Sequence, residues 1–475
     1  MNRYELTSEC HVLDLDNDAE SFIAYFPLKS LVLKINSAAA DLLRGMKQKS
    51  VAKANDHELE FLGYLEALKV VNGSAEILPD APRYEVPEPV STLLLLSDRC
   101  NLRCIYCYGS SDSTGDNMPL EIAIAAIDNI LGNALKHETG FIEIGFHGGG
   151  EPTMNWDVLV GVIEYAEGLC QQKALRLQSS ICSNGIMAEE QVKWLAEHIS
   201  NITVSIDGPP EIQNWQRPLP GGAPSFDHVA RTIDVLDSLD KQYAFRTTAT
   251  AMSESSLTDV YTFLTTKFHP TTVCIEPLFV CGRCVTSHCQ PPAAEAFARN
   301  LMEILNRSRQ TKVSLQYSGG RLFFLDTRFC GAAGSNFFVT PRGDITACVE
   351  VSRRQDPRAE IFMYGNYDAA SGKFTFDTAK FNQLVRLRVQ DFDSCKDCFA
   401  RWHCCGDCLA KAPALTRIKE QRNPYRCSIN QAVTKHQLLL ELKGTDTGNV
   451  PAEQKPQPCA RGTAKKEGVH GRQEI

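Results

Sequence analysis

The 475-residue sequence has no long hydrophobic run and no excess of positive charge. Its longest purely apolar stretch runs only from Ile122 to Ile127, whereas a membrane-spanning helix needs about 20 apolar residues. The 49 basic residues are outnumbered by 57 acidic ones, which argues against binding to nucleic-acid phosphates or anionic membranes. The first 20 residues lack the apolar core of a signal peptide and contain six Asp or Glu. We therefore expect a soluble cytoplasmic protein without membrane or nucleic-acid partners.

Cysteine is abundant, with 19 residues, and is unevenly distributed. An odd number in a long chain without an export signal makes a disulfide framework the weaker interpretation, and short spacings favour metal or iron–sulfur ligation. The groups are Cys100, Cys104 and Cys107; Cys281, Cys284 and Cys289; and Cys395, Cys398, Cys404, Cys405 and Cys408, with Cys330, Cys348 and Cys427 placed singly around the third. The others, Cys10, Cys170, Cys182, Cys274 and Cys459, are interpreted as packing or tail residues.

Residues 90–310 alternate regularly between strand-like and helix-like runs. The expected strands lie at 92–97, 141–146, 175–182, 202–206, 244–250 and 272–278, and the expected helices at 120–136, 156–171, 188–198, 226–239, 257–268 and 293–308. Six strands that are each followed by a helix imply parallel β/α units and an α/β fold class. Because six units are two short of a closed eight-fold barrel, we expect an open, partial (β/α)6 barrel with its site at the carboxyl ends of the strands.

The regions on either side of this barrel have different patterns. Residues 1–85 form a small unit, followed by a proline-spaced linker up to residue 89; we expect strands at 22–26, 31–35 and 75–78 and helices at 37–46 and 57–70. Residues 316–440 lose the periodicity and are dominated by Gly, Cys and short β-prone runs, with one last helix at 431–442. Residues 444–475 have almost no large apolar side chains and are expected to be disordered.

The first cysteine group follows the first barrel strand directly, with the spacing C-x3-C-x2-C. Its three thiolates, Cys100, Cys104 and Cys107, can hold three corners of a four-iron, four-sulfur cube and leave the fourth iron open. A zinc knuckle, which prefers four protein ligands, and chance loop cysteines are the alternatives. With Tyr106 before the last cysteine, this loop resembles the signature of the radical S-adenosylmethionine (SAM) superfamily.

Four downstream segments extend the resemblance. The run from Gly145 to Thr153 ends the second strand; in the family such glycines, here Gly149 and Gly150, let backbone approach the SAM amino group, and an acid, here Glu151, anchors it. After the third strand, Asn184 lies in a turn similar to the family's Thr-Asn-Gly. After the fourth, Ser205 and Asp207 resemble residues that face the ribose, and Arg217 one that pairs with the SAM carboxylate. Taken alone, the glycines would indicate a flexible turn and Arg217 a solvated surface residue.

The resemblance implies a cofactor and a reaction class. The open iron would chelate the amino and carboxylate groups of SAM, and an electron from a flavodoxin or ferredoxin type donor would cleave the S–C5′ bond. The resulting 5′-deoxyadenosyl radical would remove hydrogen from an unactivated substrate carbon, while the protein orients the cofactors and excludes water and oxygen. No catalytic residue beyond this cluster is identified from the sequence.

The C-terminal cysteines resemble the seven-cysteine SPASM extension of radical SAM enzymes that modify peptides and proteins. By the family pattern, one auxiliary 4Fe-4S cluster takes Cys330, Cys348 and Cys408, and a farther one takes Cys395, Cys398, Cys404 and Cys427. This implies three 4Fe-4S clusters in all; a zinc-ribbon-like fold is the alternative. Cys405 lies outside the motif.

Seven ligands leave one iron of the two auxiliary cubes without a protein thiolate. The middle group, Cys281, Cys284 and Cys289, is not required by the family pattern. These cysteines could cap the nearer auxiliary cluster, act in redox or thiol exchange, or be inert.

The N-terminal unit resembles the PqqD-like precursor-recognition element, a winged-helix-like module that binds a leader peptide as an extra strand. The likeness rests on residues 25–28 and 31–36 and on the Ala-rich helix that leads to Leu43. A domain that merely supports the barrel is the alternative.

The main hypothesis is therefore a radical SAM–SPASM peptide maturase that cross-links side chains of a ribosomally made precursor through a thioether or carbon–carbon bond. A sulfatase-maturase-like oxidase of Ser or Cys is the first alternative; that family typically has Asp where this chain has Val349. A non-enzymatic iron–sulfur electron carrier would explain the cysteines but not Gly148 to Glu151, Asn184, Ser205 and Asp207.

Overall fold

The computed structural model describes residues 3–445, apart from 16–17, 49, 52–53, 79, 110, 323–324 and 414–417. The tail expected to be disordered lies outside the described residues, except for its first two positions, which end the last helix. Cys459 also lies outside them. No helix in the described part of the chain is long and apolar enough to cross a membrane.

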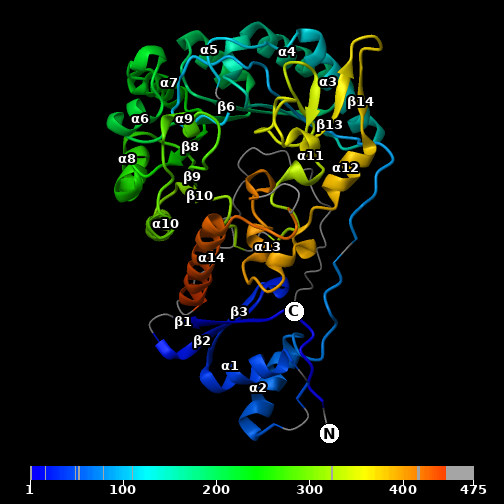
Figure 1. Ribbon diagram of the computed structural model, residues 1–475, viewed down its shortest axis with the longest axis vertical. Coiled ribbons are helices and arrows are strands. Elements are labelled where there is room, and N and C mark those ends of the chain that lie inside the picture. The colour runs from blue at the N-terminus through cyan, green and yellow to red at the C-terminus, as the bar shows by residue number, and fades with distance from the viewer. Residues whose placement is uncertain are drawn as a thin grey trace.

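The N-terminal unit is a three-stranded antiparallel sheet followed by two helices (Figure 1). Its elements are β1 (His11–Leu15), β2 (Asp18–Phe26), β3 (Leu31–Asn36), α1 (Ser37–Met46) and α2 (Asp56–Ala67), and the strand order is β1-β2-β3. Asn36 and Asn55 cap the two helices, each accepting a hydrogen bond from a backbone N–H three residues later. The strand expected at 75–78 is wrong: the segment is irregular, and Ile77 is 93% exposed, so nothing packs on it.

The central sheet contains all six expected parallel strands. They are β4 (Ser91–Leu94), β5 (Phe141–Phe146), β6 (Arg176–Ser183), β7 (Asn201–Ser205), β8 (Tyr243–Ala249) and β9 (Thr272–Pro277). The helices that follow them are α3 (Leu120–Lys136), α4 (Trp156–Lys173), α5 (Glu189–His198), α7 (Phe226–Ser238), α8 (Leu257–Lys267) and α10 (Ala294–Ser308), and Figure 1 shows them along the outside of the strands. Their buried apolar faces form one continuous core with the sheet, which explains the regular alternation in the sequence.

The sheet continues beyond the six expected strands on both sides, in the order β10-β9-β8-β7-β6-β5-β4-β11-β12-β13-β14. The additional strands are β10 (Ser314–Gln316), β11 (Phe338–Val339), β12 (Asp344–Thr346), β13 (Met363–Asp368) and β14 (Lys373–Phe376). Strand β11 pairs in parallel with β4, so the cysteine-rich region continues the sheet beyond the first of the six parallel strands. Three of these strands, β10, β11 and β12, have only two or three residues and therefore no readable periodicity; the sequence predicted short β-prone runs in residues 316–440 without placing individual strands.

The N-terminal unit docks on the C-terminal region, at the opposite end of the molecule from α4 and α5 (Figure 1). Ile23 and Tyr25 of β2 pack on Leu438 of α14 (Pro424–Thr445), a helix that begins seven residues before its expected start. Glu9 accepts hydrogen bonds from Arg401 at 2.5 Å and from the Trp402 indole at 2.7 Å. The N-terminal unit therefore packs against α14 and against the segment between Cys398 and Cys404.

Candidate functional site

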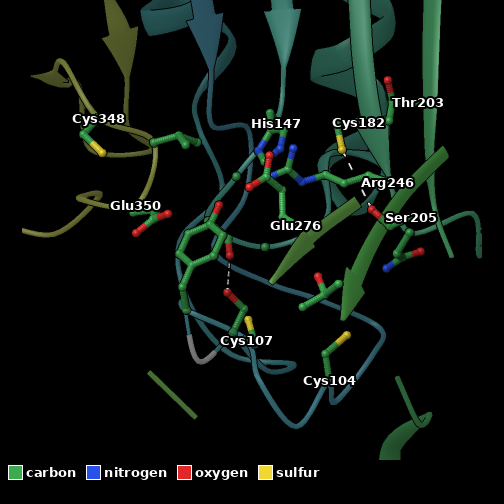
Figure 2. Close-up of a pocket in the computed structure, with 18 of the residues that line it drawn as sticks. Cys104, Cys107, His147, Cys182, Thr203, Ser205, Arg246, Glu276, Cys348 and Glu350 are labelled. Atoms are coloured by element: carbon green, nitrogen blue, oxygen red, sulfur yellow. Dashed lines mark hydrogen bonds between the residues drawn. The ribbon is translucent and has the colours of Figure 1, made fainter. Parts of the chain in front are cut away.

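A cavity of about 300 Å³ lies at the carboxyl ends of the parallel strands. Loops after successive parallel strands converge at one edge of a sheet, so residues distant in sequence meet there. Figure 2 shows Cys348 and Glu350 on one side of this cavity, Cys182 and Ser205 on another, and Cys104 and Cys107 at its base. It is therefore bounded by the parallel sheet and by the cysteine-rich region together.

The three cysteines of the first group all line the cavity. Burial raises the pKa of the Cys100 thiol to about 11, and the nearby Glu151 charge adds to the shift. Burial raises the pKa of Cys104 to about 12, and Cys107 and Cys100 contribute further because like charges repel. Backbone N–H groups of Arg103 and Ile105 hold the loop to the carbonyls of Pro218 and Gln216. Such a set of thiols suits a positively charged iron cluster, because metal coordination stabilises the thiolate form.

The glycine turn packs against this cysteine loop. Gly148 and Gly149 adopt positive φ angles of 72° and 62°. A Cβ on Gly150 would lie 1.9 Å from the Arg99 carbonyl oxygen, so a side chain cannot be placed there. The glycine at 150 is thus required by the backbone of the cysteine loop, whereas the sequence interpretation attributed the requirement to the ligand.

Glu151 is a buried carboxylate, 2% exposed, at the wall of the cavity. Its oxygens accept hydrogen bonds from the Ser183 hydroxyl and the Asn184 backbone N–H, both at 2.8 Å, and from Thr153. Burial nevertheless raises the pKa of Glu151, and no cation among the described residues forms an ion pair with it. A buried negative charge held by neutral donors suits the ammonium group of SAM.

Arg217 also lines the cavity and is held by Asp207. Its Nε and Nη2 donate to the two Asp207 carboxylate oxygens at 2.9 and 3.1 Å, and its guanidinium lies over the Tyr106 ring. With 7% exposure, it is not the solvated surface residue of the alternative interpretation.

Asp207 has no free oxygen for a ribose. Besides Arg217, it accepts from the Tyr106 hydroxyl at 2.5 Å, from Gln216 at 2.7 Å and from the Thr248 backbone N–H at 2.9 Å. Asp207 is fully buried, and the structure makes it the anchor of Arg217 and Tyr106, not a wall of the cavity. Of the pair expected at the ribose, only Ser205 reaches the cavity, with Cys182 Sγ 3.8 Å from its hydroxyl.

The C-terminal cysteines differ in whether they line the cavity. Cys330, Cys348 and Cys408 line the cavity. Burial raises the pKa of Cys408 to about 12, with smaller effects of Glu350 and Cys330, and burial together with the same Glu350 charge raises the pKa of Cys348. The four cysteines of the farther set are absent from the cavity wall; they are Cys395, Cys398, Cys404 and Cys427. Burial raises the pKa of Cys395, Cys404 and Cys427, and the charges of neighbouring cysteines in this set add to the shift.

The spacing of these cysteines bears on what they could hold. Among the described residues, no three His, Cys, Asp or Glu side chains converge closely enough to hold a single metal ion. A four-iron cube is larger than one ion, and its thiolate ligands stand correspondingly farther apart. A set of cysteines too widely spaced for one ion can therefore still suit a cube, and thiolates are the ligands that such cubes take.

Several cavity residues were missed from the sequence. Arg246 of β8 and Glu276 of β9 line the cavity, together with His147 and Glu350 (Figure 2). Lys411 also lines it. Burial raises the pKa of Glu276, but Arg426 at 3.5 Å, Arg246 and Lys411 outweigh this effect, so its pKa is lowered overall. For Arg246 and Glu276 the sequence did offer a signal, because a charged residue within a strand that is covered on both faces is rarely placed there without a partner or a function. Cys182, interpreted as a packing residue, also lines the cavity, which corrects that expectation.

Comparison with known proteins shows which sequences this chain resembles. Residues 94–249 match the radical SAM superfamily. The chain is 25% identical over 346 residues to the cysteine-type anaerobic sulfatase-maturating enzyme of Clostridium perfringens, covering 67% of this chain and 89% of that protein. It is 23% identical over 360 residues to the serine-type enzyme of Klebsiella aerogenes, covering 70% and 83%.

Solved structures show the same fold. The Clostridium enzyme with bound SAM and a peptide superposes with a TM-score of 0.62 at 20% identity, covering 76% of this chain and 99% of that one. SuiB of Streptococcus suis bound to SAM gives a TM-score of 0.50 at 14% identity, covering 89% and 99%. With the matched region spanning the cysteine loop, the glycine turn and the residues around Arg217, the chain is a radical SAM enzyme that resembles the anaerobic sulfatase-maturating enzymes.

Proposed function

We propose that this radical SAM enzyme is a peptide maturase that joins side chains of a ribosomally made peptide through a thioether or carbon–carbon bond. The observation that carries the proposal is the shared cavity. The cysteines of the first group, Cys100, Cys104 and Cys107 (the SAM-side cysteines), line the same space as Cys330, Cys348 and Cys408. A substrate in this cavity would lie between the two sets. When bound, SAM and its cluster supply a 5′-deoxyadenosyl radical that removes a hydrogen atom from the substrate.

The chain's own residues would bind and orient SAM. Glu151 receives the ammonium group, and the part of the Arg217 guanidinium that faces the cavity receives the carboxylate. Asp207 positions Arg217 and keeps its charge fixed, because the two are paired through two hydrogen bonds in a buried site. Gly149 and Asn184 line the same wall, and Ser205 is the residue that would face the ribose.

The auxiliary cysteines would complete the reaction. Joining two side chains removes two hydrogen atoms from the peptide: one as an atom and the other as a proton with an electron. Cys330, Cys348 and Cys408 would hold a 4Fe-4S cluster able to accept that electron at the far wall of the cavity. The farther set would hold a third cluster, which passes electrons between the cavity and a flavodoxin or ferredoxin type protein.

The N-terminal unit, residues 1–85, would recognise the leader of the peptide. β3 lies at an edge of the three-stranded sheet, and an extended peptide can pair with such an edge. The face of the sheet that carries Ile23 and Tyr25 packs on α14. Leader binding at the edge would therefore place the peptide beside the SPASM region, residues 316–440. The proposed architecture is a winged-helix-like module followed by a partial (β/α)6 barrel.

A Ser or Cys oxidase is the second candidate, and the similarity to sulfatase-maturating enzymes favours it. The solved Clostridium enzyme carries a bound peptide, so a peptide substrate fits both candidates. Against the oxidase, Val349 stands where the resemblance expects Asp. The next residue, Glu350, is engaged by Arg358 at 3.5 Å and Lys411 at 3.8 Å.

Co-expression with each short peptide encoded beside this gene, followed by mass spectrometry, tests the proposal. A cross-link removes two hydrogen atoms and yields a product that does not react with a hydrazide probe. Oxidation of Ser removes the same mass but creates an aldehyde, which the probe labels. A labelled product would establish the oxidase and reject the maturase. The Cys100→Ala variant is the matched control, and it should leave the peptide unchanged.

A further inference from the structure

The structure separates the three cysteines of the middle group, which follow β9. Cys284 and Cys289 are buried against Leu278, Ile105 and Tyr106. The Cys284 thiol donates a hydrogen bond to the Cys289 carbonyl at 2.8 Å, which closes the turn around α9 (Cys284–Ser287). Cys281, in contrast, is half-buried and lines the cavity. The three cysteines therefore lie in different surroundings, and of the three only Cys281 lines the cavity.

The segment that carries Cys281 is fixed to the SAM-side cysteine loop. The Arg283 backbone N–H donates to the Cys107 carbonyl at 2.9 Å, and its guanidinium donates to the carbonyls of Cys104 at 2.8 Å and Ser111 at 2.5 Å. Gly282 has a φ of +55°, and a Cβ there would lie 2.3 Å from the Cys107 carbonyl oxygen. Both features hold Cys281 at a defined place on the cavity wall.

The segment that carries Cys281 also contacts the nearer auxiliary set. The ammonium group of Lys411, three residues after Cys408, lies 5.5 Å from the centre of the Phe279 ring, two residues before Cys281. Lys411 is also 3.8 Å from Glu350, which follows Cys348 by two residues. Cys281 lines the cavity together with Cys330, Cys348 and Cys408, and the segments that carry Cys281, Cys348 and Cys408 meet at Lys411 and Glu350.

We propose that Cys281 supplies the fourth thiolate of the nearer auxiliary cluster, together with Cys330, Cys348 and Cys408. The inference rests on the proposed function, in which those three cysteines leave one iron of a cube without a protein ligand. It makes the nearer cluster a fully ligated electron acceptor, because no iron is left open to bind a thiol of the peptide.

The test uses the anaerobically reconstituted full chain carrying Ala at Cys100, Cys104 and Cys107, so that only auxiliary clusters are observed. This background should hold roughly 8 irons, as two cubes require. Adding Cys281→Ala should open one iron: either the electron paramagnetic resonance spectrum of the reduced protein changes on addition of cyanide, or up to about 4 irons are lost. Adding Cys284→Ala instead, as the matched control, should change neither iron content nor cyanide response.

Alkylation of the wild-type holoenzyme gives a second, independent measurement. Iodoacetamide should leave Cys281 unmodified, as it leaves Cys330, Cys348 and Cys408, and should modify all four after the iron is chelated. Labelling of Cys281 in the holoenzyme while the other three stay protected, or a Cys281→Ala spectrum identical to that of its background, would overturn the inference. A background variant without iron would instead contradict the proposed function.

Discussion

Replacing Glu151 with Gln tests whether this buried carboxylate binds the ammonium group of SAM. The substitution keeps the size of the side chain, and its amide oxygen can still accept from Ser183 and Thr153. It removes the negative charge, and the amide nitrogen would face the Asn184 backbone N–H, which is also a donor. The variant therefore keeps the local packing while losing the group that attracts the SAM ammonium.

The expected effect follows from the burial of Glu151. A charge-assisted hydrogen bond contributes about 1.5–3 kcal/mol, and 2% exposure leaves little solvent to compensate for its loss. At about 1.4 kcal/mol per decade, SAM should bind roughly ten- to a hundredfold more weakly. Iron content and the ultraviolet–visible spectrum should be unchanged, because the cysteines remain in place.

The pH dependence adds a second signature. Burial raises the pKa of Glu151 above its ordinary value of 4.5, so the folded protein protonates this group more readily than an exposed carboxyl. Protonation removes the attraction for the ammonium. SAM affinity of the parent enzyme should therefore fall as pH is lowered through the raised pKa, and the Glu151→Gln variant should lack this dependence.

Anaerobic calorimetric titration with SAM measures both effects. Glu143→Gln is the matched control: burial also raises the pKa of this carboxyl on β5, but it lies outside the cavity wall. SAM should bind the control as it binds the parent. Equal affinity of the parent and Glu151→Gln would refute the assignment of Glu151 to the SAM ammonium.

Three further predictions concern the clusters and Arg217. Ala at Cys100, Cys104 and Cys107 together should abolish production of 5′-deoxyadenosine while the C-terminal iron remains; deoxyadenosine made by this variant would reject these ligands. The reconstituted wild-type chain should contain about 12 irons, as three cubes require; metal analysis giving about 4 irons with stoichiometric zinc would indicate a C-terminal zinc module. Arg217→Ala should weaken SAM binding and also destabilise the fold by about 3–5 kcal/mol in denaturant titration, because Asp207 would remain buried without its cation; a variant as stable as the parent would contradict the role given to this pair.

The central strands were predictable because their signal is local. The six strands are β-prone runs that alternate with helical runs, and each predicted run ended within a few residues of the observed strand. The cysteine loop could also be predicted from the sequence, because its three cysteines lie within ten residues and the loop directly follows a strand. The strands β10, β11 and β12, of two or three residues, have no such signal, because pairing with a neighbouring strand and not periodicity defines them. Where the individual strands from β11 to β14 lie was not predicted, although the sequence indicated short β-prone runs in this region.

The fine structure of the site depends on tertiary contacts that the sequence does not encode locally. Asp207 follows the fourth barrel strand, as a ribose-binding acid would, but its oxygens are occupied by donors from Tyr106, Gln216, Arg217 and Thr248. Glycine at 150 is required by the carbonyl of Arg99, fifty-one positions earlier. Neither relation could be read before the loops were placed side by side.

The most direct test of the account is the transfer of hydrogen from the peptide to SAM-derived 5′-deoxyadenosine. The peptide identified by co-expression would be prepared with deuterium at its side-chain carbons and incubated with the reconstituted enzyme, SAM and a reductant. The account predicts deuterium in 5′-deoxyadenosine, one atom for each pair of hydrogens that the peptide loses. Modified peptide accompanied by deoxyadenosine without deuterium would contradict the claim that this enzyme acts on the peptide through the SAM radical.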